Sequence, residues 1–254
     1  MRRALGLLML LSTAWSARAL SPLMAYEPLA ADTAKTGALR VYESRSTVLP
    51  ERLVTWQTQF FSSLDLPDGS RQVTLKTGTT GSVVWPPSRN EVYVLDPRGL
   101  FTPSSTTDPP DPTEYGPTAL LAAQPELQHV DHVWRFEGKR QVPFSFTVLM
   151  LTARNMDPVA TSGRYHVLSI GPLETPAGSF ATAVQVAGVE RIALNLGDLL
   201  NDEVLLRCRR WYVRGVGLVQ ELLEFPSYPS LGRLTTVLTS HPGLAPEPLE
   251  VKAK

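Results

Sequence analysis

The chain has 254 residues with 24 basic and 24 acidic side chains, so its formal net charge is zero. Such a balance argues against nucleic acid as a partner, because phosphate backbones attract a basic surface. The single cysteine cannot form an internal disulfide, and a chain of this length can bury enough surface to fold without one.

The first nineteen residues have the pattern of a secretory signal peptide. Arg2 and Arg3 precede a short apolar run, and Ala17-Arg18-Ala19 places small residues where signal peptidase reads them. The run is much shorter than the roughly 20 residues of a spanning helix. We therefore expect cleavage, a mature chain with 21 basic and 24 acidic residues (net −3), no transmembrane span, and a periplasmic or extracellular location. An uncleaved N-terminal anchor is the alternative.

A flexible segment is expected over residues 20–38, followed by a single β-rich domain over residues 39–240. In 52–61, Val54, Trp56 and Phe60 share one face, the alternation of a strand with one buried side. Runs that are apolar or alternating in the same way, bounded by turn residues, predict about ten strands. These are 52–61, 72–76, 82–85, 91–95, 143–152, 164–170, 180–189, 204–213, 216–225 and 231–239.

Helix is expected to be scarce. Only the alanine- and leucine-rich segment 118–123 and the connector 197–203 invite one, and segments this short make marginal helices. The sequence therefore predicts a mainly β protein, built on a curved antiparallel sheet that forms a half-barrel or open barrel.

Two segments lack periodicity. Residues 102–117 contain five prolines, which fix φ and remove ladder donors, so a loop is expected there. It is interpreted as an excursion from one sheet; a linker between two domains is the alternative. Residues 241–254 carry three prolines, and a disordered tail is expected.

Large aromatic side chains supply the candidate ligand-binding face. They fill a core in the simplest interpretation, whereas a hollow sheet would turn them toward an apolar cavity for a lipid-like ligand. The residues proposed for this face are Trp56, Phe60, Trp134, Phe144, Phe146 and Trp211.

Evidence for catalysis or a metal is weak. His129 and His132 are the only clustered metal-ligand types, but residues three apart face opposite ways on a strand, and zinc needs further ligands. No nucleophile motif is present. Neither a metal nor another cofactor is expected, and a hydrolase using Asp131, His129 or His132 is the least favoured function. Arginines beside Cys208 would favour a reactive thiolate, but a buried strand residue is expected.

Two motifs specify backbone geometry in the C-terminal third. In Pro176-Ala-Gly-Ser-Phe180, Gly178 can take a positive φ in a turn before the next strand. In Trp211-Tyr-Val-Arg-Gly-Val-Gly-Leu-Val219, Gly215 and Gly217 interrupt an apolar run, which predicts a bulge or bend.

These two motifs resemble the paired signature of the DUF3108-like or TapB-like proteins, a bacterial exported family of unknown function. The resemblance covers roughly residues 125–226, with a weaker match around Trp134, and departs from the family at Gln220, where lysine is common. It implies a curved antiparallel sheet similar to periplasmic lipoprotein carriers, and it carries over no active site.

The function expected from these observations is non-enzymatic. An exported envelope protein would bind an apolar ligand, such as a lipid, or a partner protein on its curved sheet. The alternative is a structural or assembly protein of the envelope that works through sheet-edge pairing or surface contact.

Overall fold

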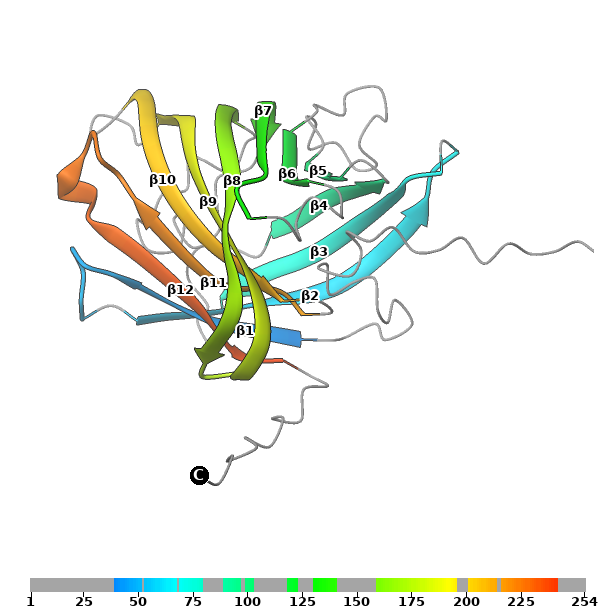
Figure 1. The fold of residues 1–254 in the computed structure, drawn as a ribbon, viewed down its shortest axis with the longest axis horizontal. Helices are drawn as coiled ribbons and strands as arrows, with labels where there is room; N and C mark the ends of the chain where they lie inside the picture. The colour runs from blue at the N-terminus through cyan, green and yellow to red at the C-terminus, as the bar shows by residue number, and fades with distance from the viewer. Residues whose placement is uncertain are drawn as a thin grey trace, which may run out of the picture.

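The computed structural model describes residues 39–51, 53–67, 69–79, 89–96, 99–102, 118–122, 130–140, 159–195, 201–213 and 216–241. Nearly all of these residues lie in strands (Figure 1). The elements are β1 Leu39–Ser46, β2 Leu53–Asp65, β3 Arg71–Thr79, β4 Arg89–Asp96, β5 Gly99–Thr102, β6 Thr118–Ala122, β7 Val133–Arg140, β8 Val159–Thr175, β9 Gly178–Asn195, β10 Asn201–Val213, β11 Gly217–Glu224, the 3₁₀ turn η6 Pro229–Leu231 and β12 Arg233–Ser240.

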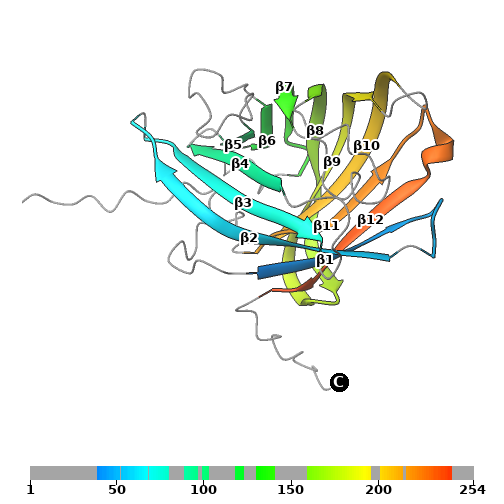
Figure 2. The ribbon, with the colours of Figure 1, turned by 180° about the vertical axis from the view of Figure 1, so that it is seen from behind.

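The strands form one curved antiparallel sheet (Figures 1 and 2). Its order is β6-β5-β4-β3-β2-β1-β12-β11-β10-β9-β8-β7, so consecutive strands are neighbours and β1 pairs with β12. Among the described residues no backbone pairing joins β6 to β7, and the sheet is open there. The predicted fold class, a curved antiparallel sheet with little helix, is confirmed. No helix in the described part of the chain is long and apolar enough to cross a membrane.

Within the segment 118–123, where a helix was considered, the described residues Thr118–Ala122 form the strand β6. β6 pairs with β5, and Thr118 lies opposite Thr102. The proline-rich segment therefore connects two paired strands of the same sheet. The alanine- and leucine-rich sequence of β6 is too short to form a stable helix by itself, so pairing with β5 determines its conformation.

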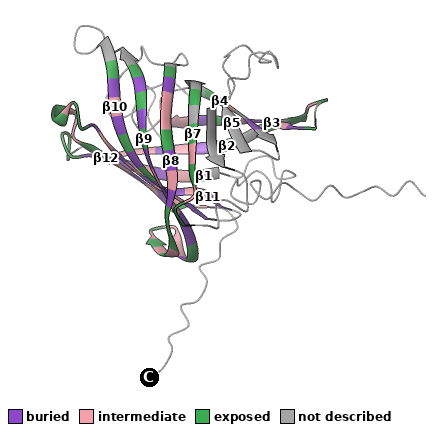
Figure 3. Cartoon of the chain, turned by 45° about the horizontal axis from the view of Figure 1, so that its top comes forward, coloured by how far each residue is buried: buried purple, intermediate pink, exposed green. Residues whose placement is uncertain are grey.

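β8 and β9 are much longer than the alternating runs predicted, because polar residues at both ends still pair in the ladder. Along β8 to β12 buried and exposed residues alternate (Figure 3). We call the side that carries Tyr165, Glu190 and Arg210 the buried face. The opposite side, which carries Arg164, Val189 and Arg209, is the exposed face.

The first motif forms the tip of the long β8–β9 hairpin. Thr175 pairs with Gly178 across the two-residue turn Pro176-Ala177, and Gly178 has φ 146°, as its sequence predicts. The hairpin reaches across the sheet to β12, where the Ala177 amide donates to the Leu238 carbonyl at 3.3 Å (Figure 1). The turn therefore connects the β8–β9 hairpin to β12, which is not its neighbour in the sheet.

The second motif is a chain reversal, where a bulge or bend within a strand run was predicted. β10 ends at Val213, which pairs with Gly217 at the start of β11, and the Val216 amide donates to the Val213 carbonyl at 3.0 Å. Gly217 has φ 87°, which allows the reversal, and the expected bulge lies earlier, between Trp211 and Tyr212. Gly215 lies outside the described residues.

Both motifs contribute to one hydrophobic cluster. Leu173, Ala177 and Phe180 come from the first hairpin, and Trp211 and Val213 from the second. They pack with Ala183 of β9 and with residues in or next to β1, β2, β11 and β12, namely Tyr42, Val54, Trp56, Val216, Val219 and Leu238. The motif pair is thus a packing unit of the fold.

Several predictions lie outside the described residues. They concern the signal peptide and residues 20–38, the strands 82–85 and 143–152, Phe144, Phe146 and His129, most of the proline-rich loop, and the tail after residue 241. Phe60 lies in β2, but its side chain is not described.

Candidate functional site

A charged cluster is enclosed on the buried face of β8 to β11. The Arg210 guanidinium donates from Nε to Glu221 Oε1 at 2.8 Å, and from Nη1 to Glu190 Oε1 at 3.1 Å and the Tyr165 hydroxyl at 2.6 Å. Tyr165 also donates to Glu190. Burial alone would lower the pKa of Arg210, but the acidic groups of Tyr165, Cys208, Glu190 and Glu221 raise it well above its ordinary value. Arg210 is therefore a permanent cation held in place by its neighbours.

This cluster continues as a row of polar side chains across neighbouring strands. Arg210 lies opposite Glu221, Glu221 opposite Thr236, and Thr236 opposite Ser44. Ser44 Oγ and Thr236 Oγ1 are 2.8 Å apart, and Trp56 Nε1 donates to Ser44 Oγ at 2.8 Å. Arg210 thus bonds to Glu221, and Ser44 bonds to both Thr236 and Trp56, so these polar contacts help to hold the strands in register.

Cys208 belongs to the same buried face, which confirms its predicted burial. It is 2% exposed, and its thiol donates to Glu190 Oε1 at 3.5 Å. The flanking Arg207 and Arg209 alternate to the exposed face, away from the sulfur. The two arginines that would favour a reactive thiolate are therefore on the opposite face of the strand from the Cys208 thiol.

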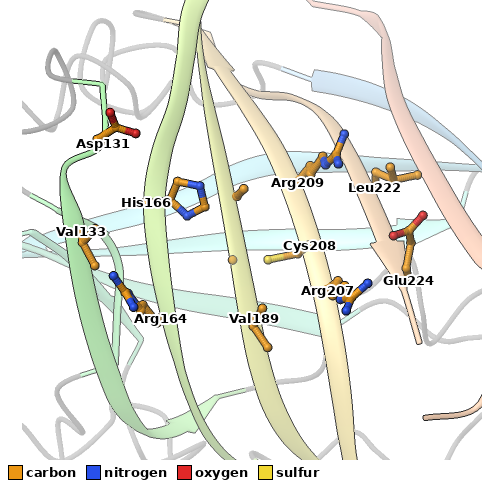
Figure 4. Close-up of a pocket in the computed structure, with 12 residues that line it drawn as sticks. Asp131, Val133, Arg164, His166, Val189, Arg207, Cys208, Arg209, Leu222 and Glu224 are labelled. Atoms are coloured by element: carbon orange, nitrogen blue, oxygen red, sulfur yellow. The ribbon is translucent and has the colours of Figure 1, made fainter. Parts of the chain in front are cut away.

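An open groove of about 700 Å³ lies over β7 to β11 (Figure 4). Most of its residues project from the exposed face, and the directly opposed pair Gly188 and Cys208 completes the lining. Its apolar surface comes from Val133, Ala187, Val189 and Leu222, and its charged or polar residues are Asp131, Arg164, His166, Arg207, Arg209 and Glu224.

The charge of this groove is predominantly positive. Arg164, Arg207 and Arg209 form no ion pair with any residue that the structure describes. Glu224, by contrast, is paired with Arg233 at 2.6 Å, which neutralises one of the two acids. Three guanidinium groups are thus available to a ligand beside apolar side chains such as Val189, which is 43% exposed.

Of the proposed aromatic face, the structure describes the side chains of Trp56, Trp134 and Trp211, and none of these three lines the groove. Trp56 stacks on Tyr42 with ring centroids 4.4 Å apart, and Trp211 packs against the same cluster. Trp134 is on β7, beside Tyr165 at 5.5 Å, and its buried Nε1 has no hydrogen-bond partner. These three residues divide between a filled core and the edge of the sheet.

Two of the three residues of the hydrolase hypothesis are described, Asp131 and His132, and they lie just before β7. Asp131, with φ 68°, lines the groove, and its amide donates to the Val167 carbonyl at 2.8 Å. His132 stacks on Trp134 and does not line the groove. No group of three metal-ligating side chains occurs in the part of the chain that the structure describes.

Sequence reasoning missed the groove because its residues come from several strands whose register is set by tertiary pairing. One signal was present: Arg207 and Arg209 alternate with Leu206 and Cys208, so the two arginines had to share a face. The contributions of Arg164 and Leu222 required the order of β8 to β11.

Comparison with protein-family models finds no match, and comparison with curated protein sequences finds none either. Among solved structures, a candidate lipoprotein from Parabacteroides distasonis ATCC 8503 is similar, with a TM-score of 0.48 and 14% identity over 82% of this chain and 95% of that one. A candidate exported protein with a YmcC-like fold from Bacteroides fragilis NCTC 9343 has a TM-score of 0.44 and 13% identity over 82% and 96% of the two chains. At this distance, function must be argued from this chain's own residues.

Proposed function

We propose that this is a non-enzymatic exported protein of the bacterial envelope that binds an anionic amphiphile in the groove over β7 to β11. The observation that carries the proposal is the presence in one groove of three guanidinium groups that form no ion pair with the described residues, beside exposed apolar side chains. The signal-peptide pattern supports export. Resemblance to the DUF3108-like proteins remains a prediction.

The groove has the size and chemistry for such a ligand. A volume of about 700 Å³ lies within the range of small-molecule sites. Arginine binds carboxylate and phosphate through two parallel hydrogen bonds, which gives the anionic end a defined position. Val133, Val189 and Leu222 would remove the apolar part from water. A purely apolar ligand would leave the guanidinium groups without partners, so an amphiphile fits better.

Binding is the activity favoured over catalysis. Asp131 and His166 both line the groove, but His132 turns away from it and Cys208 is buried beneath the arginines. The described residues of the groove therefore combine a positive charge with apolar contacts, and the one thiol among them, Cys208, is directed to Glu190 on the buried face.

The proposal is tested by calorimetric titration with a monoacyl glycerol phosphate below its micelle concentration. The double variant Arg207→Glu/Arg209→Glu should bind at least tenfold more weakly, because charge reversal replaces attraction by repulsion. Arg45→Glu, an exposed change on β1 outside the groove, should bind like the wild type. Equal affinities for all three proteins would contradict the proposal.

A protein partner is the second candidate, favoured by one observation. Beyond the groove, β8 carries two exposed apolar residues at its register shift, Leu168 (40% exposed) and Ile170 (36% exposed), with Ile170 opposite Val184. Such a patch is typical of a contact surface. Edge pairing has less support, because the edge strands β6 and β7 approach each other. Crosslinking to one envelope protein that Ile170→Glu abolishes, together with unchanged amphiphile binding by the charge-reversed variant, would favour this candidate.

A further inference from the structure

A second polar row crosses the sheet near the ends of β1 and β12, away from the groove. Arg40 lies opposite Thr58 on β2, and Thr58 lies opposite Thr77 on β3. Ser240 pairs with Val41, so the antiparallel register brings His241 beside Arg40. Arg40, Thr58 and His241 therefore lie side by side on neighbouring strands.

This row contains a buried cation that no acid in the described part of the chain neutralises. Arg40 is 6% exposed, its Nε has no hydrogen-bond partner, and it forms no ion pair with the residues that the structure describes. Glu43, the next acid along β1, alternates to the other face of the strand. Two glutamates balance the charge of the other buried arginine, Arg210. Arg40 differs from Arg210 in having no such acid among the described residues.

The neighbours of Arg40 also have unused hydrogen-bonding capacity. Thr58 is 6% exposed, and its Oγ1 has no partner; His241 Nδ1 is likewise buried and unpaired. A hydroxyl and an imidazole N–H can each donate to the same acceptor that a guanidinium binds. Buried polar groups in native proteins normally have partners, so three adjacent groups without one indicate a missing acceptor.

We infer that Arg40, Thr58 and His241 form a binding site for the carboxylate or phosphate group of a ligand. The guanidinium supplies the charge, and the two neighbours supply additional donors. His241 is only partly buried, which leaves an approach from the end of β12. Next along the same strands, the stacked rings of Tyr42 and Trp56 provide an apolar wall. The source of the anionic group is either a small free anion or the headgroup of an amphiphile.

His241 provides a direct reporter of occupancy. Burial, and then the charge of Arg40, lower its pKa from 6.5 to about 4, so the ring is neutral at pH 7. An anion bound between Arg40 and His241 would offset that positive charge and favour the imidazolium. Anion binding should therefore raise the pKa of His241.

The experiment is an NMR titration of the His241 ring in the full protein at constant ionic strength, in chloride and in inorganic phosphate. We expect phosphate to raise the His241 pKa saturably in the wild type. In Arg40→Met the pKa should already be higher in chloride and should not respond to phosphate, and in Arg45→Met it should behave as in the wild type. Arg40→Gln serves as a second variant if the methionine variant unfolds.

Further titrations with acetate and with a monoacyl phosphate identify the source of the anionic group. Binding of the monoacyl phosphate at least tenfold more tightly than inorganic phosphate, dependent on Arg40, would assign a headgroup site; equal binding would assign a free-anion site. A His241 pKa that none of these anions changes, or that they change equally in Arg40→Met, would overturn the inference. The groove variant Arg207→Glu/Arg209→Glu should retain the response, so this test is independent of the proposed function.

Discussion

At the scale of single residues, Gly188 and Tyr165 fit tightly against each other. The two are direct partners on β9 and β8, and the tyrosine ring covers the glycine on the buried face. A Cβ on Gly188 would overlap the ring and would lie 3.2 Å from the Arg164 carbonyl oxygen. Since Tyr165 is held by Arg210 and Glu190, the ring cannot turn aside without breaking those bonds.

Gly188→Ala should therefore lower the free energy of unfolding by about 1–3 kcal/mol, the usual cost of overpacking. Gly171→Ala is the matched control, because Gly171 lies in β8 with nothing within 4 Å of an added Cβ. Urea unfolding monitored by tryptophan fluorescence measures both. Equal stability of the two variants would show that the ring does not cover Gly188 as described.

His241 links stability to pH. Its pKa is about 4 in the folded protein, against 6.5 when unfolded, so the unfolded state binds more protons between these values. Its contribution to stability is complete above pH 6.5 and is lost as the pH falls toward 4. The stability difference between wild type and His241→Gln should therefore shrink from pH 7 to pH 4. A difference that is constant across this range would contradict the account of His241 burial.

At the scale of strands, the Arg210 cluster is expected to be a major source of stability. Arg210→Met leaves Glu190 and Glu221 buried without their cation, and breaking a buried pair in this way costs about 3–5 kcal/mol. Arg233→Met removes an exposed ion pair with Glu224 and should cost no more than about 1 kcal/mol. Chemical denaturation measures the free energy of unfolding of both variants. Similar decreases in the two would show that burial does not strengthen the Arg210 ion pairs.

Most of the strands and the curved antiparallel form of the sheet were predictable, but the pairing that brings residues of different strands together was not. Alternation identifies β2, β3 and β11, and the proline-glycine turn identifies the tip of the β8–β9 hairpin. The strand at 118–122 was missed because its conformation depends on pairing with β5. Likewise, Trp56 and Trp211 were candidates for a ligand face, but the hairpin tip closes over them.

At the scale of the whole molecule, one sheet presents two different surfaces. The buried face contains the hydrophobic cluster and the satisfied Arg210 row, which together hold the fold. The groove with its three arginines, which form no ion pair with described residues, lies over the opposite face of the same strands. Along β8 to β11, the residues that stabilise the fold thus alternate with the residues that line the groove. Groove variants should therefore alter binding without unfolding the protein.

The most direct test of this account is the affinity of the groove for a monoacyl glycerol phosphate, measured by calorimetry in the wild type and in Arg207→Glu/Arg209→Glu. Both proteins should have the same unfolding midpoint, and the variant should bind at least tenfold more weakly. Undiminished binding by a folded variant would contradict the assignment of the groove as the ligand site.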